Sequence, residues 1–208
     1  MIKSTAIYRQ AHYWLSAHQL SQLPADSGWE VAFAGRSNAG KSSAINAITG
    51  QRSLARTSKT PGRTQQIIFF QLDEHRRLVD LPGYGFAKAP LAIKRQWQHT
   101  LEGYLHTRRS LRGLILMMDI RHPFTEFDQQ MLNWCQLSQM PVHILLTKAD
   151  KISYGKATTT LQQVNQRLES FSGTITAQLF SAWKWLGVEA VQNYLNNWLE
   201  IATPTRTP

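Results

Sequence analysis

The chain has 208 residues, of which 42% are hydrophobic and 17% charged, which suits one globular α/β domain with a sizeable core. Its formal net charge of +10 makes a polyanionic partner such as RNA worth considering, although basicity alone identifies none. A single cysteine, Cys135, excludes an internal disulfide and favours a reducing compartment. Because no apolar run approaches the ~18 residues of a membrane span, we expect a cytoplasmic protein.

The order of apolar runs and helical patterns predicts one domain with short extensions. Residues 1–27 show no clear period, and we expect an arm packed on the domain; residues 202–208 are rich in Thr and Pro and predict a disordered tail. Between them, the patterns predict strands at 31–34, 67–70, 78–79, 114–118, 142–146 and 174–180, and helices at 42–49, 91–107, 127–137, 158–171 and 188–201. Strands that alternate with helices predict a mainly parallel sheet.

The segment 35–42 reads Gly, four residues, then Gly-Lys-Ser, between a predicted strand and a predicted helix. Glycines allow successive backbone N–H groups to converge on phosphate oxygens, and the N-terminus of the following helix adds partial positive charge. In such a loop Lys41 would reach the β- and γ-phosphates, and the Ser42 hydroxyl would ligate Mg²⁺. The residues predicted to line the phosphate are Gly35, Arg36, Ser37, Asn38, Ala39, Gly40, Lys41, Ser42 and Ser43.

This phosphate loop sets the predicted fold class. We expect the α/β three-layer sandwich of P-loop NTPases, in which helices cover both faces of a mainly parallel six-stranded sheet. One strand is expected to be antiparallel, because the runs 67–70 and 78–79 read as a hairpin.

An acidic residue ends the second strand of that hairpin, in the sequence Asp80-Leu81-Pro82-Gly83. At a strand end after a phosphate loop, the Asp80 carboxylate can hold the magnesium shell while the Gly83 N–H meets the γ-phosphate. By itself the pattern would equally suit an Asp that caps a helix or a turn.

A basic loop, residues 51–64, separates the phosphate loop from the hairpin. A threonine there would supply a second magnesium-bound hydroxyl, and spacing alone does not choose between Thr60 and Thr64. The cations of this loop, which could meet RNA phosphates together with Lys88 further along the chain, are Arg52, Arg56, Lys59 and Arg63.

Guanine specificity is predicted by Thr147-Lys148-Ala149-Asp150, which follows a buried strand. The Asp150 carboxylate can accept hydrogen bonds from guanine N1–H and the exocyclic N2 amine, which adenine does not offer, and the Lys148 stem could lie along the base. Phe180-Ser181-Ala182, after the last strand, can present a backbone N–H to guanine O6.

These motifs, in this order and spacing, resemble the EngB family (the YihA/YsxC type) of the TrmE-Era-EngA-EngB-septin-like class of translation-factor-related GTPases. The resemblance covers about residues 28–201, expected to form the GTPase domain, and rests on the wording of 35–43, 55–65, 80–88 and 147–151. It implies that Thr64 is the magnesium threonine and that 51–66 and 81–90 are two switch loops. The site residues that it adds are Gly62, Arg63, Thr64, Gln65 and Gln66.

Membership of this family would imply a bacterial cytosolic protein that binds GTP and GDP with Mg²⁺. We expect it to be a monomer, although the sequence does not determine the oligomeric state. Its expected partner is the precursor of the large ribosomal subunit, RNA and protein, rather than DNA or a membrane. Family members are needed for assembly of that subunit and for normal cell division and septation. The alternative from the residues alone is a phosphoryl-transfer enzyme that uses a guanine nucleotide on a small substrate.

Hydrolysis is expected to be slow. The groups predicted to act in it are Lys41, Thr64 and Gly83, through positioning and charge neutralisation, whereas Tyr84 stands where many GTPases have a water-orienting Gln. Asn38 could hold K⁺ near the phosphates, as in related GTPases, or be a turn residue that tolerates unusual backbone angles.

Overall fold

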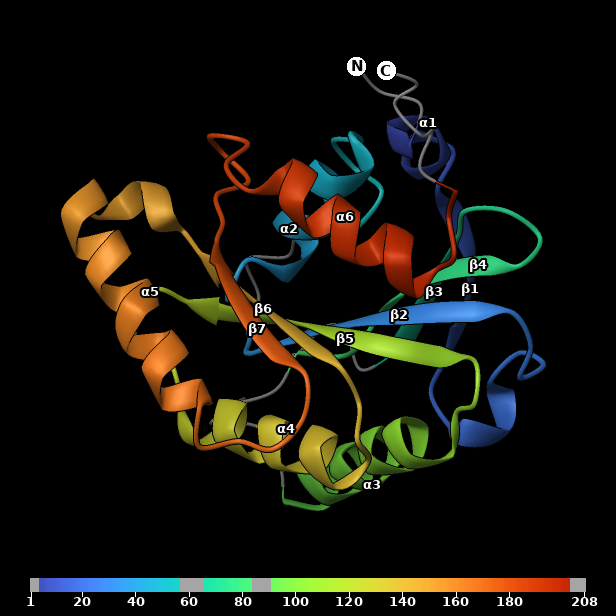
Figure 1. Ribbon diagram of the computed structural model, residues 1–208. Coiled ribbons are helices and arrows are strands. Elements are labelled where there is room, and N and C mark those ends of the chain that lie inside the picture. The colour runs from blue at the N-terminus through green and yellow to red at the C-terminus, as the bar shows by residue number, and fades with distance from the viewer. Residues whose placement is uncertain (1–3, 57–65, 84–90, 203–208) are drawn as a thin grey trace.

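The structure is a computed structural model that describes residues 4–56, 66–83 and 91–202. Its strands are β1 (His12–Ala17), β2 (Trp29–Gly35), β3 (Ile67–Gln71), β4 (Arg76–Asp80), β5 (Leu111–Asp119), β6 (Val142–Thr147) and β7 (Ile175–Leu179). Its helices are α1 (Ser4–Arg9), α2 (Lys41–Thr49), α3 (Leu91–Thr107), α4 (Glu126–Leu137), α5 (Tyr154–Leu168) and α6 (Val188–Trp198), with short 3-10 turns at Leu20–Gln22 and Ala149–Lys151. Helices cover both faces of the sheet (Figure 1).

The seven strands lie in the order β1-β3-β4-β2-β5-β6-β7. Parallel pairing joins β4 to β2, β2 to β5, β5 to β6 and β6 to β7, whereas β3 runs antiparallel to both β4 and β1. The expected fold class, with one strand reversed, is therefore confirmed. The expected count of six strands is wrong by one, because β1 pairs with β3 at the edge of the sheet.

That additional strand lies inside the expected arm, and its sequence hides it. The register of β1 against β3 is irregular between Tyr13 and Leu15, and its first three residues are all exposed. An edge strand with such an irregularity loses the alternation that identifies a strand. The arm also reaches the other end of the chain, where the Tyr8 hydroxyl donates a hydrogen bond to Asn196 Oδ1 at 2.7 Å.

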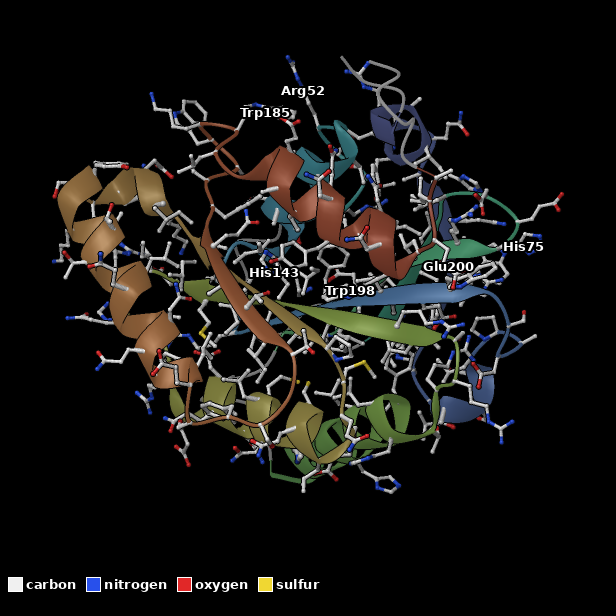
Figure 2. The ribbon with its side chains drawn as sticks, in the orientation of Figure 1. Arg52, His75, His143, Trp185, Trp198 and Glu200 are labelled. Carbon is white, nitrogen blue, oxygen red and sulfur yellow. The ribbon has the colours of Figure 1, made fainter. Side chains whose placement is uncertain are left out.

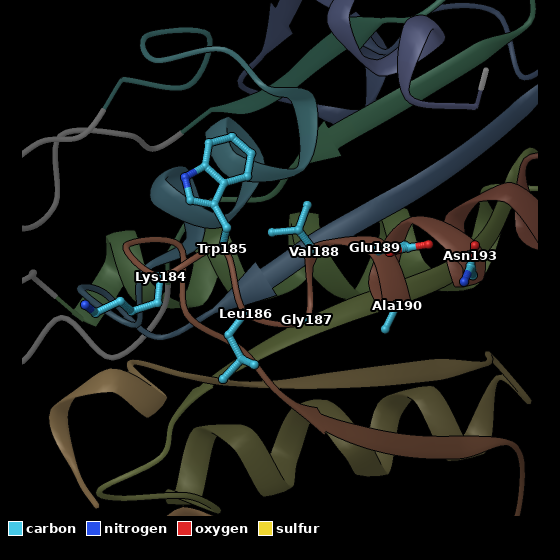
Figure 3. A pocket seen from close by; sticks show the side chains of 8 residues that line it. All are labelled: Lys184, Trp185, Leu186, Gly187, Val188, Glu189, Ala190 and Asn193. Atoms are coloured by element: carbon cyan, nitrogen blue, oxygen red, sulfur yellow. The ribbon is translucent and has the colours of Figure 1, made fainter. Parts of the chain in front are cut away.

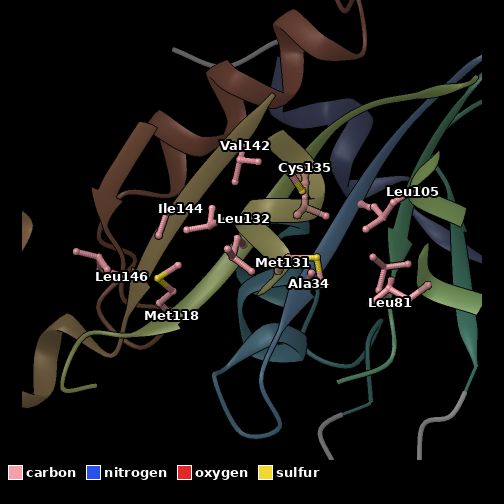
Figure 4. Close-up of a cluster of buried hydrophobic side chains, with 14 of the residues drawn as sticks. Ala34, Leu81, Leu105, Met118, Met131, Leu132, Cys135, Val142, Ile144 and Leu146 are labelled. Carbon is pink, nitrogen blue, oxygen red and sulfur yellow. The ribbon is translucent and has the colours of Figure 1, made fainter. Parts of the chain in front are cut away.

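Buried side chains fill both spaces between the sheet and its helices. Along β5, Leu114 and Leu116 belong to the core under α3, α4 and α5, whereas Ile115 belongs to the core under α1, α2 and α6. This explains why residues 114–118 of β5 form an unbroken apolar run. Figure 4 shows the first core, in which Cys135 is buried and the pKa of its thiol is raised by that burial to about 12.

Helix α6 packs against β2 and, through aromatic side chains, against β6 (Figure 2). The ring of Tyr194 stacks on the buried His143 of β6, with 3.7 Å between the ring centroids, and Trp198 meets Tyr194 edge to face. His143 also forms hydrogen bonds with Thr176 and Gln178 of β7. Helix α6 is thereby fixed to the sheet.

The fold brings the predicted motifs to one edge of the sheet. Parallel strands end on the same side, and the residues that end β2, β4, β5 and β6 are Gly35, Asp80, Asp119 and Thr147. In open α/β sheets, ligands bind outside these carboxyl ends. Among the helices that the structure describes, none is long and apolar enough to cross a membrane.

Candidate functional site

The phosphate loop turns the chain from β2 into α2 by using two residues in the left-handed backbone region. Asn38 has φ of 64° and Gly40 has φ of 96°, and the Ala39 N–H donates to the Arg36 carbonyl at 2.9 Å. Helix α2 then begins at Lys41, so its N-terminal N–H groups lie at the carboxyl end of β2. This is the geometry in which a loop and a helix N-terminus bind phosphate.

Lys41 and Asp80 form an ion pair, which joins the first motif to the third. Strand β4 lies beside β2 in parallel register, with Phe33 opposite Asp80, and the Leu81 N–H donates to the Phe33 carbonyl at 3.0 Å. Burial raises the pKa of the Asp80 carboxyl, and the Lys41 ammonium only partly offsets this effect. Both charges are nearly inaccessible to water, so their pairing is electrostatically strong.

Gly83, which follows β4, lies close to the backbone of the phosphate loop. A Cβ atom built on Gly83 would lie 3.5 Å from the backbone of Ser37. The segment 80–83 therefore runs directly against the loop, as the assignment of the Gly83 N–H to the γ-phosphate requires.

The donors at this edge fit Mg²⁺ bound together with a nucleotide. The Ser42 hydroxyl in the first turn of α2 and the Asp80 carboxylate are hard oxygen ligands, which Mg²⁺ prefers. Among the described residues no group of three or more His, Cys, Asp or Glu side chains could hold a metal ion by itself. Mg²⁺ commonly uses one or two protein oxygens and completes its shell with phosphate and water. Thr64, the other predicted ligand, lies outside the described residues.

The guanine motif is tied to the phosphate loop by two side chains. The Thr147 hydroxyl donates to the Ala39 carbonyl at 2.6 Å, and Lys148 Nζ donates to the Asn38 carbonyl at 2.7 Å. Lys148 itself has φ of 60°, in the left-handed backbone region. The two motifs, more than 100 residues apart in sequence, therefore form one site.

Asp119, at the end of β5, holds Lys148 in place, although none of the predicted motifs includes it. Its carboxylate accepts hydrogen bonds from Lys148 Nζ at 2.9 Å and from Arg121 Nη2 at 2.6 Å. Burial disfavours the charged carboxylate, but these hydrogen bonds outweigh it and hold the pKa of Asp119 well below its usual range. The feature of the sequence that could have identified Asp119 is its position as an acidic residue at the end of a buried strand.

Asp150 lies at this edge with its side chain largely buried, in contact with the last predicted segment. The Ser181 hydroxyl donates to Asp150 Oδ1 at 2.6 Å, and this hydrogen bond, together with Lys151 nearby, lowers the carboxyl pKa. The Ala149 N–H donates to the Phe180 carbonyl at 3.2 Å. Segments 147–150 and 180–182 are therefore neighbours, as guanine recognition requires.

For residues 62–66 and Asn38, the roles in nucleotide or cation binding remain predictions. Residues 62–65 lie outside the part of the chain that the structure describes. Gln66 directs its side-chain amide to His18 of the arm, 2.6 Å away. Asn38 has the left-handed backbone of a turn residue, which does not test whether it also holds a cation.

Comparison with known proteins agrees with this geometry. Residues 30–148 match the protein family described as 50S ribosome-binding GTPase. The probable GTP-binding protein EngB of Nitrosococcus oceani is 59% identical over 196 residues, which cover 94% of this chain and 98% of that protein. The chain belongs to the EngB family of GTP-binding proteins. It is accordingly a GTP-binding protein and a GTPase.

Solved structures show that this fold is shared with other proteins that bind guanine nucleotides. A crystal structure of a probable GTP-binding protein engB has a TM-score of 0.66 at 21% identity, covering 83% of this chain and all of that one. Era of Aquifex aeolicus, in a variant bound to GDP.AlF4−, has a TM-score of 0.61 at 17% identity over 87% of this chain and 60% of that one. At such identities the likeness concerns the fold alone.

Proposed function

We propose that this EngB-family protein is a slow GTPase switch that acts in assembly of the large ribosomal subunit, and that normal cell division and septation depend on this role. The observation that carries the proposal is the single site formed by the phosphate loop, Asp80 and the guanine motif. In support, the family that matches residues 30–148 is described as 50S ribosome-binding. Such a role implies a cytoplasmic location.

In the proposed site, side chains already gathered at the carboxyl edge of the sheet would each bind one part of GTP with Mg²⁺. Lys41, at the N-terminus of α2, supplies positive charge for the β- and γ-phosphates. Asp150 would accept guanine N1–H and N2 hydrogen bonds, in place of or beside the Ser181 hydroxyl that it now accepts. Ser42 and Asp80 would hold Mg²⁺, which when bound neutralises charge on the phosphates.

Slow hydrolysis remains a prediction, because Tyr84 lies outside the described residues. A monovalent cation near Asn38 is likewise proposed and untested. Single-turnover hydrolysis measured in potassium and in sodium would examine both points, since a cation role predicts faster turnover in potassium. Equal rates in the two salts would refute the cation role.

The proposed partner is RNA and protein of the large-subunit precursor. Arg52 and Arg56, at the beginning of the basic loop, are exposed, and the net charge of +10 favours association with RNA phosphates. The resemblance to the EngB family implies that this loop is a switch. The cations that would contact RNA therefore belong to a segment whose conformation would change between the GTP-bound and GDP-bound protein. RNA binding would then depend on whether GTP or GDP is bound.

Co-sedimentation with large-subunit particles across a salt series tests this proposal. The protein is loaded with GDP or with a non-hydrolysable GTP analogue, and the Arg52→Gln/Arg56→Gln double variant is compared with an Arg109→Gln/Arg112→Gln control at the opposite end of β5. We expect tighter binding with the analogue, and a salt slope reduced by ~0.7–0.9 for each RNA phosphate that the double variant no longer neutralises. Equal binding in both nucleotide states would refute the switch.

A further inference from the structure

The loop between β7 and α6 exposes large apolar side chains directly beside the guanine motif. Trp183 is 79% exposed and Trp185 is 59% exposed, and Leu186 next to them is also exposed. Figure 3 shows the shallow pocket of about 690 Å³ below this loop, lined by Lys184, Trp185 and Leu186 on one side and by the first turn of α6 on the other. We call residues 183–186 the tryptophan loop.

Hydrogen bonds hold the tryptophan loop in a defined shape. Ser181 and Leu186 form an antiparallel bridge in which each backbone N–H donates to the other residue's carbonyl at 3.1 Å. At the loop's end, Gln178 Nε2 donates to the Gly187 carbonyl at 2.8 Å. Trp185 itself has φ of 54°, a backbone conformation that bulky residues rarely adopt and that often marks a functional position. Both exposed indoles therefore belong to a loop whose backbone is held by hydrogen bonds.

The surroundings of the tryptophan loop carry positive charge and join it to the guanine motif. Lys184 lies between the two tryptophans in the sequence, and its backbone N–H donates to Ser181 Oγ at 3.1 Å. The same oxygen donates to Asp150, and the neighbouring Lys151 side chain is 63% exposed. Glu189 also lines the pocket, and Lys151 forms an ion pair with Asp150 at 3.4 Å, so the positive charge within the loop itself comes from Lys184.

We propose that the tryptophan loop is a stacking surface for unpaired RNA bases, on which Trp183 and Trp185 contact base faces while Lys184 and Lys151 contact phosphates. This inference rests on the proposed function, because it names the surface that would meet ribosomal RNA. Exposed aromatic rings with interleaved cations are typical of proteins that bind single-stranded RNA. A protein partner would favour an apolar surface whose centre is depleted of lysine.

Binding of a fluorescein-labelled, unstructured 12-residue RNA to the full chain, measured by anisotropy with the GTP analogue bound, tests the stacking surface. Trp183→Leu/Trp185→Leu keeps apolar area and removes the rings, whereas Trp183→Phe/Trp185→Phe keeps aromatic faces. We expect the Leu double variant to bind about tenfold or more weakly and the Phe double variant to bind within about threefold of the parent. Lys184→Gln should reduce the salt slope by ~0.7.

Tyr13→Leu, on the edge strand β1, is the matched control, because Tyr13 is also an exposed aromatic residue, and it should leave the affinity unchanged. GTP affinity and the urea midpoint of every variant are measured alongside, so that loss of folding is recognised. Equal RNA affinity of the parent and the Leu double variant would overturn the proposal. So would equal weakening in the Leu and Phe double variants, because the weaker binding would then not depend on aromatic faces.

The large-subunit particles separate this inference from the proposed function. If the parent fails to bind particles in a GTP-dependent manner but binds the RNA through the indoles, the proposed function fails and the stacking surface stands. If the Leu double variant binds the RNA like the parent, and particles in a GTP-dependent manner, the stacking surface fails alone. Loss of particle binding in that variant with RNA affinity unchanged would indicate a protein contact instead and would also overturn the proposal.

Discussion

At the scale of single residues, the site depends on side chains that connect one motif to the next. Lys148 reaches the carbonyl of Asn38 and the carboxylate of Asp119, while Asp80 pairs with Lys41. Each of these charges is partly or wholly removed from water, so removing one partner leaves the other with an uncompensated charge. Substitutions in the site should therefore separate two effects on nucleotide binding: a change of base preference and a loss of affinity that is the same for every nucleotide.

Asp150 should determine the base. We expect Asp150→Asn to weaken GTP binding by on the order of 1–3 kcal/mol, because the charged acceptor for guanine N1–H and N2 is removed, and to favour xanthine nucleotides, whose 2-oxo group suits an amide donor. Competition between GTP and XTP for the purified protein measures this change. Glu126→Gln, an exposed acidic residue at the start of α4, is the control. Unchanged preference for GTP would remove Asp150 from the site.

Asp119 should act through Lys148 without choosing the base. We expect Asp119→Asn to weaken GTP and GDP binding alike, by roughly tenfold or ~1–2 kcal/mol, because Lys148 loses the charge-assisted hydrogen bond that positions it against Asn38. Direct titration with the two nucleotides and with XTP measures the change. A shift of preference toward XTP in this variant would contradict a purely positioning role.

At the scale of elements, α2 fixes the beginning of the basic loop as well as the phosphate loop. The side-chain amide of the buried Asn46 donates to the Ala55 carbonyl at 2.9 Å, and its oxygen accepts from the Ala55 N–H at 2.8 Å. It also donates to the Arg52 carbonyl at 3.3 Å. The helix that carries Lys41 therefore holds residues 52–55, which precede the proposed switch threonine.

Asn46→Ala should expose the importance of this connection. Truncation leaves the buried N–H and carbonyl of Ala55 without partners, so we expect the free energy of unfolding to fall by roughly 1–3 kcal/mol. Urea denaturation of the variant and parent measures the difference. The control is Asn165→Ala, on the exposed face of α5, whose free energy of unfolding should lie within about 0.5 kcal/mol of the parent's. An equal loss of stability in both variants would show that the Asn46 hydrogen bonds do not stabilise the loop.

Elements with a strong local pattern could be predicted from the sequence. The helix expected at 91–107 has these bounds in the structure, and the phosphate loop, the hairpin and the guanine motif lie where the spacing put them. Helix α5 begins earlier than expected, at Tyr154, because the Ser153 hydroxyl accepts a hydrogen bond from Lys156 N and caps it. Capping contacts decide such boundaries more than hydrophobic period does.

Other features depend on contacts between distant segments and carry little local signal. Strand β1 is defined by its pairing with β3. The role of Asp119 is visible only once β5 and β6 lie side by side, with Asp119 opposite Thr147. From the sequence alone, the tryptophan loop matches no motif. Its place beside the guanine motif follows from the bridge between Ser181 and Leu186 and from the hydrogen bond of Ser181 to Asp150.

At the scale of the whole molecule, the buried contact between α6 and the sheet should make stability depend on pH. Burial lowers the pKa of His143 to about 4, so the folded protein keeps this ring neutral where an unfolded chain, with a pKa near 6.5, would protonate it. Protons then favour the unfolded state between these values, and stability falls as pH decreases from about 6.5 to 4.

His143→Gln should reduce that dependence, because Gln offers polar atoms without titrating. We expect the parent to lose roughly 2–3 kcal/mol more than the variant between pH 7 and pH 4. Urea unfolding at several pH values provides the comparison, in which buried carboxylates affect both proteins equally. Parallel stability curves for the two proteins would show that His143 does not carry the effect.

GTP binding and ribosomal binding should favour the same arrangement of the molecule. By linkage, particles that bind the GTP form better must raise the affinity for GTP by the same factor. The most direct measurement is the affinity for a non-hydrolysable GTP analogue and for GDP, with and without saturating large-subunit particles. We predict that the particles increase the affinity for the analogue relative to GDP by ~5–150-fold. An unchanged ratio of the two affinities would contradict this coupling.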